Sequence, residues 1–349
     1  MPKNNIKRTY HTFNYPMATS QSQTLLTGIR GVGPELIISG FFQSTSSANP
    51  QSFIYKGNKH GKGEWFNLSY PSSAGVTVTG TSLYGPNYDN KKNRIQVVGN
   101  YATVEAGMSA LGCLYEGTFN GIGLWTTLLP TSSSQVLNTI AHSTNGGLVV
   151  GNYDTVLVQG KAFIYDIHTQ QYFDITNPNA VSITAYGIWH NGKDKYTICG
   201  GLTTTTATNV AYVVDWNNKT HTFHNWRTYN FNNDPKKSLI THFDGITEGS
   251  VKGTYNLTGD HVGVSSSNSL GFFATVHRKG KHGRFSKKAY WEPISYPHKQ
   301  TTSGNSVYEN TVIGVYTPKE GVYINGYISY LKNKKDKKDK KDKNKNKNK

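Results

Sequence analysis

The feature that most constrains this chain is a short motif that recurs six times along its 349 residues. Each copy has two mostly apolar residues before a glycine, and an aromatic residue often follows, as in "VVGNY". The glycines of the six copies are Gly40, Gly99, Gly151, Gly200, Gly253 and Gly314, spaced 49 to 61 residues apart. Such a period indicates one structural unit that is repeated throughout the fold.

Every repeat unit has the same internal order of segments. A Phe/Tyr-rich segment such as "AFIYDI" follows the glycine motif, then a third segment that often ends in proline, such as "YFDITNP", and then a fourth, such as "TAYGIW". Segments rich in Tyr, Thr and Gly without helical periodicity are typical of strands and turns. Four short strands at this period predict a β-propeller blade, with the fourth segment as the innermost strand of the next blade.

The order of segments also predicts how the ring closes. The last unit ends at residue 331 without an outermost strand, whereas residues 8–16, which include "TYHTFNYP", have the pattern of an outermost strand without a neighbour. We therefore predict an all-β, six-bladed β-propeller of four-stranded antiparallel blades over residues 1–331, closed by the N-terminal strand so that no sheet edge stays open. The predicted blades span 24–71, 78–130, 138–178, 182–228, 239–297, and 303–331 together with 8–16.

One stretch resembles a known family of repeats. The blade "VVGNYDTVLVQGKAFIYDIHTQQYFDITNPNAVSITAYGI", within residues 148–190, is similar to the bacterial HAF-type repeats. This resemblance implies a propeller unit and, from the family's description, an extracellular protein. Where those repeats carry a His before the Phe-rich strand, this chain has Lys161 or Ser52. Because "MPKNNIKRTYHTF" lacks the apolar run of a Sec signal peptide, the sequence alone leaves the location open.

The innermost strands of a propeller line its central channel, so equivalent positions form a ring. The ring residues, just before the inner-strand glycine, are Thr27, Tyr84, His142, Tyr186, Asp244 and Tyr308, and the inner hairpins add Trp189, His190 and Arg30. Tyr, His and Asp side chains at a channel mouth can hydrogen-bond a polar ligand and stack on a sugar ring. The same side chains could instead hydrogen-bond one another and plug the channel.

Fold alone does not decide the function, because propellers host enzymes, lectins and scaffolds. The main prediction is a monomeric binding module that recognises a glycan-like ligand or a protein partner at the channel mouth. The alternative is a hydrolase or lyase on a polysaccharide or another polar substrate, which would use His142, Asp244 and Tyr186. The sequence has no HExxH, paired CxxC or P-loop motif, so neither a metal nor a cofactor is predicted. Cys113 and Cys199 fall in different units and are predicted to be buried, reduced thiols.

Positive charge concentrates in a tail and two hairpins. The formal net charge is +17, and residues 332–349 alone hold 11 Lys and 3 Asp without an apolar residue, which predicts a disordered tail. The hairpins "KGNKHGKGEW" and "HRKGKHGRFSKK" share a Lys-His-Gly-Lys/Arg pattern. The candidate polyanion-binding residues are Lys59, His60, Lys62, Lys279, Lys281, Arg284, Lys335, Lys338 and Lys341. They predict contact with nucleic acid or another polyanion, which would make the chain a structural or packaging protein, or they serve only as solvated turns and a solubilising tail. No run is apolar enough to predict a membrane span.

Overall fold

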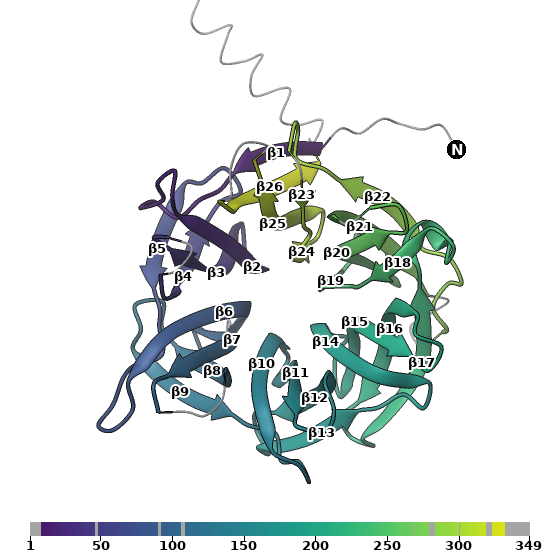
Figure 1. The fold of residues 1–349 in the computed structure, drawn as a ribbon, viewed down its shortest axis with the longest axis horizontal. Coiled ribbons are helices and arrows are strands. Elements are labelled where there is room, and N and C mark those ends of the chain that lie inside the picture. Colours follow the sequence, from purple (N-terminus) through teal and green to yellow (C-terminus); the bar gives the residue numbers. More distant parts are fainter. Residues whose placement is uncertain are drawn as a thin grey trace, which may run out of the picture.

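The computed structural model describes residues 8–45, 48–89, 92–105, 109–266, 268–278, 283–299, 301–318 and 323–331. Within these residues the regular secondary structure is β-strand, except for the short 3-10 turn η1 (Phe231–Asn233). The sheets are arranged around a central axis like the blades of a propeller (Figure 1). No helix in these described ranges is long and apolar enough to cross a membrane.

Four separate sheets in the described chain contain four antiparallel strands each. The first is β2 (Gln23–Val32), β3 (Glu35–Gln43), β4 (Gln51–Gly57) and β5 (Gly63–Asn67), and the second is β6 (Val78–Asp89), β7 (Arg94–Thr103), β8 (Leu111–Gly117) and β9 (Gly123–Leu128). The third is β10 (Val136–Asn145), β11 (Leu148–Thr155), β12 (Lys161–Asp166) and β13 (Gln171–Ile175), and the fourth is β14 (Ala180–His190), β15 (Lys195–Thr204), β16 (Asn209–Asn217) and β17 (Thr222–Tyr229). In each sheet the strands follow chain order from the axis to the rim (Figure 1). The predicted all-β propeller with four-stranded antiparallel blades is confirmed for these sheets.

The other ten described strands form one continuous sheet. They are β1 (Arg8–Thr12), β18 (Ser238–Thr241), β19 (Gly245–Glu248), β20 (Thr254–Gly263), β21 (Ser269–His277), β22 (Tyr290–Ile294), β23 (Thr301–Thr302), β24 (Ser306–Tyr308), β25 (Thr311–Thr317) and β26 (Asn325–Leu331). One part pairs in the order β19, β20, β21, β22, and the other in the order β24, β25, β26, β1. The short β23 connects the two parts through β21 and β25.

The N-terminal strand β1 contacts the molecule on both of its sides. It pairs in antiparallel register with β26, from the far end of the chain. Arg8 is buried, and its Nε lies 2.8 Å from Glu292 Oε1 on β22. Just after β1, the ring of Phe13 packs against Tyr55 of the first blade, at a centroid distance of 4.9 Å. Segments from both ends of the sequence are therefore held together by strand pairing, an ion pair and ring packing.

The repeat glycines lie where two backbones come very close. On the strand that pairs with each innermost segment, one glycine lies so close that a Cβ on it would overlap a carbonyl oxygen of that segment, so no side chain fits. These glycines are Gly40, Gly99, Gly151, Gly200, Gly259 and Gly314. One assignment made from the sequence motif is wrong, because the fifth member is Gly259 in "NLTGD". Gly253 instead lies in a turn, with a φ of +80°.

Candidate functional site

Four inner strands carry a β-bulge at the same position. The pairing of each inner strand with its neighbour skips Thr27 in β2, Tyr84 and Gly85 in β6, His142 in β10 and Tyr186 in β14. A bulge adds a residue to one strand and turns its side chain out of the regular alternation. The repeated bulge thus directs these side chains toward the axis of the ring.

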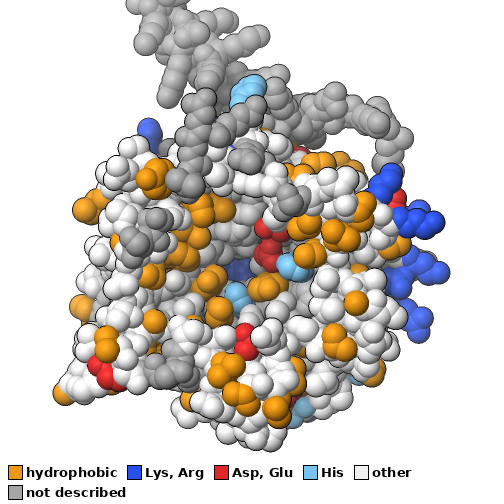
Figure 2. Space-filling model, in the orientation of Figure 1, with side chains coloured by type: hydrophobic (Ala, Val, Ile, Leu, Met, Phe, Trp, Pro, Cys, Tyr) orange, Lys and Arg blue, Asp and Glu red, His pale blue; other side chains and the backbone are white. Residues whose placement is uncertain are grey.

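The bulged residues line a cavity at one mouth of the central channel, which we call the channel cavity. Its volume is about 270 Å³. Its lining residues are Leu25, Thr27, Phe41, Tyr84, His142, Tyr186, Asp244 and Asn305. Figure 2 shows acidic and histidine side chains gathered around the central hollow of the face in view. Five of the six predicted ring residues therefore share this one cavity.

The sixth position of the ring is not Tyr308, which corrects the sequence prediction. Asn305 lines the cavity there, and its amide donates a hydrogen bond to the carbonyl oxygen of Leu26 at 2.7 Å. Tyr308 lies further along the chain, and its ring covers Gly31, where a Cβ would overlap it. The prediction failed because the last inner segment is broken into β23 and β24, and β24 begins only at Ser306.

His142 stands at the centre of a row of rings in the channel cavity. Tyr84 and Tyr186 contact it edge to face, at centroid distances of 5.0 and 4.6 Å. Asn152 Oδ1 accepts a hydrogen bond from His142 Nε2 at 2.6 Å. Burial lowers the pKa of His142 to about 4. Burial, with a contribution from the charge of Asp244, raises the pKa of Tyr186 to about 12. At neutral pH, both side chains are therefore uncharged hydrogen-bonding groups.

Two carboxyl groups interact beside these rings, and the sequence analysis found only one of them. Asp244 lies in the break between β18 and β19, while the side chain of its neighbour Phe243 is buried in the core. Asp260 lies on β20 and accepts a hydrogen bond from the backbone N–H of Gly304 at 2.9 Å.

These two carboxyl groups have different proton affinities. Burial raises both pKa values, and the charge of Asp260 raises the pKa of Asp244 further. The hydrogen bond from Gly304 favours the ionised form of Asp260, so its pKa rises only to about 6. Asp244 therefore holds its proton more strongly than Asp260, whose pKa of about 6 leaves it mostly ionised at neutral pH.

The sequence also indicates that the side chain of Asp260 faces the channel. The residues that directly follow repeat glycines include Phe41, Asn152 and Asp260. Phe41 lines the channel cavity and Asn152 contacts His142, so side chains at this position are directed toward the channel. Placing the fifth repeat glycine at Gly253 concealed Asp260.

A much smaller cavity of about 10 Å³ adjoins the channel cavity, and Arg30 lines it together with His142 and Tyr186. The buried guanidinium of Arg30 donates hydrogen bonds to the carbonyl oxygens of Ile188 at 3.0 Å and Ile246 at 3.2 Å. It also lies 5.4 Å from the ring centroid of Trp189. Burial lowers the pKa of Arg30 to about 10, so it stays charged at neutral pH. The His190 ring bonds within its own hairpin turn. Arg30, Trp189 and His190 thus hold the inner strands together and are not among the residues that line the channel cavity.

The predicted polyanion-binding residues have different surroundings. Lys59 Nζ lies 4.3 Å from the ring centroid of Tyr330, and His60 Nδ1 lies 3.1 Å from the hydroxyl of the same tyrosine. The first basic hairpin is therefore packed on β26. Lys62 and Arg284 are exposed. Lys279, Lys281, Lys335, Lys338 and Lys341 lie outside the described residues.

Neither cysteine chemistry nor a metal centre is visible in the described part of the chain. Cys113 and Cys199 are both buried and not bonded to each other, and burial raises the pKa of both thiols. Within the described ranges, no group of three or more His, Cys, Asp or Glu side chains could hold a metal ion.

Comparison with known proteins identifies similar folds. No family model matches the sequence, and a search of curated proteins finds no match. Among solved structures, the parainfluenza virus 5 hemagglutinin-neuraminidase ectodomain matches 93% of this chain and 85% of its own, with 8% identity and a TM-score of 0.52. A glycoside hydrolase matches 93% and 92%, with 10% identity and a TM-score of 0.49. The GH43 endo-arabinanase from Bacillus licheniformis matches 74% and 96%, with 13% identity and a TM-score of 0.42. At these identities the likeness shows the propeller fold alone.

Proposed function

We propose that this protein is a carbohydrate-directed hydrolase whose active site is the channel cavity. The observation that supports it is the pair Asp244 and Asp260, whose surroundings favour a proton on one carboxyl group and a charge on the other near neutral pH. Such a pair is the requirement for breaking a glycosidic bond, because one group must give a proton while the other acts as base or nucleophile.

The roles follow from these protonation states. Asp244, protonated and on the cavity wall, would protonate the leaving oxygen. Asp260 would act as the ionised partner that activates water or attacks the sugar. Tyr84 and Tyr186 offer faces on which a sugar ring can pack, and neutral His142 offers hydrogen bonding to a hydroxyl. No metal or cofactor enters this mechanism.

The similar solved structures are compatible with this proposal, but the proposal does not rest on them. The viral match is by name a hemagglutinin-neuraminidase, and two further matches are a glycoside hydrolase and an endo-arabinanase. Their identities of 8 to 13% restrict the comparison to the fold. The acid pair in this chain is the basis of the proposal.

The test is turnover on a panel of aryl glycosides and polysaccharides, with intact protein and the variants Asp244→Asn and Asp260→Asn. Each variant should lose about 10²- to 10⁴-fold in kcat, because each removes one proton-transfer group. The control is Glu64→Gln, which makes the same change of charge at an exposed carboxylate on β5. Turnover that survives both Asp variants would place the chemistry elsewhere.

The binding-module function remains the second candidate, because the same cavity presents aromatic faces and neutral polar groups. It is distinguished by binding without turnover. If the wild-type protein binds glycans on an array and cleaves none of them, and Asp244→Asn binds equally well, the cavity recognises its ligand without hydrolysing it. Polyanion binding through the basic tail is a separate proposal, to be tested by nucleic-acid binding of the protein truncated after Leu331.

We also propose that the ten-stranded sheet counts as two blades, which gives six in total with β1 as the closing outer strand. The six equivalent glycines support this count, because Gly259 and Gly314 lie in the two parts of that sheet. The pairing of β1 with β26 supports the closure.

A further inference from the structure

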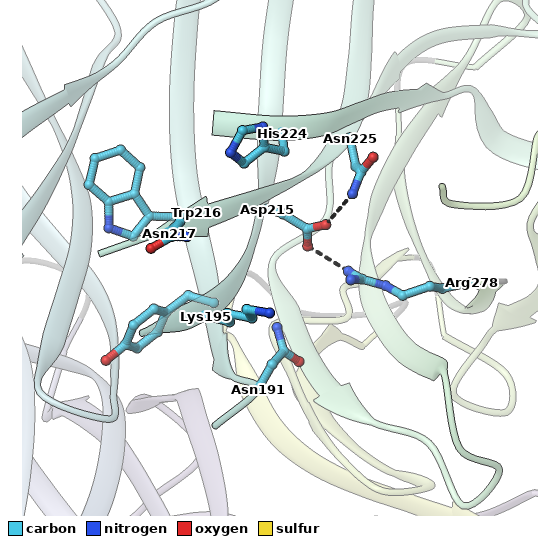
Figure 3. A pocket seen from close by; sticks show the side chains of 9 residues that line it. Asn191, Lys195, Asp215, Trp216, Asn217, His224, Asn225 and Arg278 are labelled. Atoms are coloured by element: carbon cyan, nitrogen blue, oxygen red, sulfur yellow. Dashed lines mark hydrogen bonds and ion pairs between the residues drawn. The ribbon is translucent and has the colours of Figure 1, made fainter. Parts of the chain in front are cut away.

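A second pocket, which we call the rim pocket, lies away from the channel cavity. It has a volume of about 360 Å³ and shares no lining residue with the channel cavity. Its walls come from the β14–β15 turn, from β15, β16 and β17, and from Arg278, which follows β21 in the neighbouring sheet (Figure 3). The pocket therefore forms where two sheets of the propeller meet.

The floor of the rim pocket is a buried ion pair. Arg278 Nη2 lies 2.5 Å from Asp215 Oδ1, and the two side chains are only 4% and 14% exposed. The guanidinium carbon of Arg278 lies 4.3 Å from the ring centroid of Phe285. The hydroxyl of Thr197 donates a second hydrogen bond to Asp215 Oδ1 at 3.0 Å. These contacts fix both charged groups before any ligand arrives.

The backbone departs from the repeat at this pocket. The pairing of β16 with β17 shifts between Val213 and Asp215, and Asn225 adopts a left-handed φ of +57°. The outer strand pairs of the other three separate blades keep a regular register. The bulge directs the Asn225 amide onto Asp215 Oδ2, at 2.8 Å (Figure 3). Bulges and left-handed non-glycine residues occur preferentially at functional sites.

The hydrogen bonds already made around the rim pocket show which kind of ligand its walls can bind. Both carboxylate oxygens of Asp215 already accept hydrogen bonds from within the protein. Asn191 Oδ1 accepts from the hydroxyl of Tyr255 at 2.6 Å, and Asn217 Oδ1 accepts from two backbone N–H groups. These acceptors are used internally. The amide of Asn191 donates one hydrogen bond to Thr197 Oγ1 at 2.9 Å and keeps its second N–H, and the amide of Asn217 keeps N–H donors as well.

The charges of the residues that line the rim pocket also favour a ligand that accepts hydrogen bonds. Lys195 and Arg278 line the pocket with positive charge, and Asp215 is the one acidic residue among the lining residues. A donor-rich wall with net positive charge matches a ligand that supplies negatively charged acceptor oxygens. We propose that the rim pocket binds a small ligand carrying a carboxylate or phosphate group. This inference does not depend on the proposed hydrolase function.

The experiment is isothermal titration calorimetry of the full-length protein with D-glucuronate, D-glucose and inorganic phosphate. Glucuronate should bind at least about tenfold more tightly than glucose, because the two differ mainly in the carboxylate. Phosphate separates the two possible oxyanions, and tighter binding of phosphate than of glucuronate would assign the pocket to phosphates. Failure of both anions to bind, or equal affinity for glucose, would overturn the proposal.

Variants place the binding in the rim pocket. Lys195→Gln should weaken anion binding about tenfold, and Asn225→Ala severalfold. The matched control is Lys219→Gln, which removes the same charge from an exposed lysine outside the pocket. An equal loss in Lys195→Gln and Lys219→Gln would show general attraction to a basic protein and reject the site. Asp244→Asn should leave anion affinity unchanged, so this result separates the rim pocket from the hydrolase proposal.

Discussion

The channel cavity and the rim pocket are built in opposite ways. The channel cavity uses the repeat, because one bulged position on each of several inner strands supplies a different side chain to the same ring. The rim pocket uses a departure from the repeat, because a bulge in the outer strand pair and Arg278 from the next sheet create it at one place. The channel cavity presents the carboxyl group of Asp244 and several aromatic rings, and the rim pocket presents N–H donors. A fold built from repeats can thus form a site in two ways. It can vary the side chain at an equivalent position of each repeat, or one repeat can differ in backbone structure from the others.

The largest expected effect comes from removing the N-terminal strand, which we propose closes the ring around the channel cavity. Deleting residues 1–18 removes β1, its pairing with β26 and the Arg8–Glu292 ion pair. The open strand edge and lost packing should remove most of the several kcal/mol that stabilise such a domain. Thermal unfolding followed by circular dichroism should show a loss of the cooperative transition.

The control for this deletion is removal of residues 332–349 at the other end, which should leave the melting temperature nearly unchanged. A cooperative transition at the wild-type temperature after deletion of residues 1–18 would contradict closure by the N-terminal strand.

The next effect tests whether the rim pocket is independent of the channel cavity. Asp215→Asn leaves the buried Arg278 without its anionic partner, and this should cost about 3–5 kcal/mol of stability. Urea unfolding measures the loss. Glu35→Gln is the matched control, because its 3.6 Å ion pair with Lys56 is far more exposed than the Asp215–Arg278 pair and should contribute less than about 1 kcal/mol. At low temperature, where the variant stays folded, turnover at the channel cavity should be unchanged, and a large loss of turnover would show that the two sites are coupled.

The smallest effect is a pair of opposing pH dependences within the channel cavity. Asp260 has a folded pKa of about 6, above its usual 3.8, so its contribution to stability falls as pH rises from about 4 to 6. His142 has a folded pKa of about 4, below its usual 6.5, so its contribution falls as pH drops from about 6.5 to 4. Each contribution amounts to roughly 3 kcal/mol at most. The raised pKa of Asp244 adds a further component that falls as pH rises, so the contributions of Asp260 and His142 do not simply cancel in the wild type.

Single variants separate these slopes. Relative to the wild type at the same pH, Asp260→Asn should lose stability toward pH 4 and His142→Asn should lose stability toward pH 6, both measured by urea unfolding across this range. Differences from the wild type that slope in the same direction for the two variants would contradict the shifted pKa values of Asp260 and His142.

The sequence by itself determined the class of fold and most of the channel ring. The recurring glycine, the Tyr- and Phe-rich strands and the terminal prolines repeat at one period, and each follows from local backbone geometry. Because equivalent positions face the same way, Thr27, Tyr84, His142, Tyr186 and Asp244 could be assigned to one ring from spacing alone.

Only the tertiary structure decided the features that depend on where the repeat fails. Asn305 replaces Tyr308 because the last inner segment is broken, and Asp260 joins Asp244 because the fifth glycine is Gly259. The rim pocket required knowing that Arg278 enters from the next sheet and contacts Asp215. A sequence period shows only what the repeat units have in common. The pKa values and the pockets depend on contacts between different units, and the sequence of one repeat does not contain those contacts.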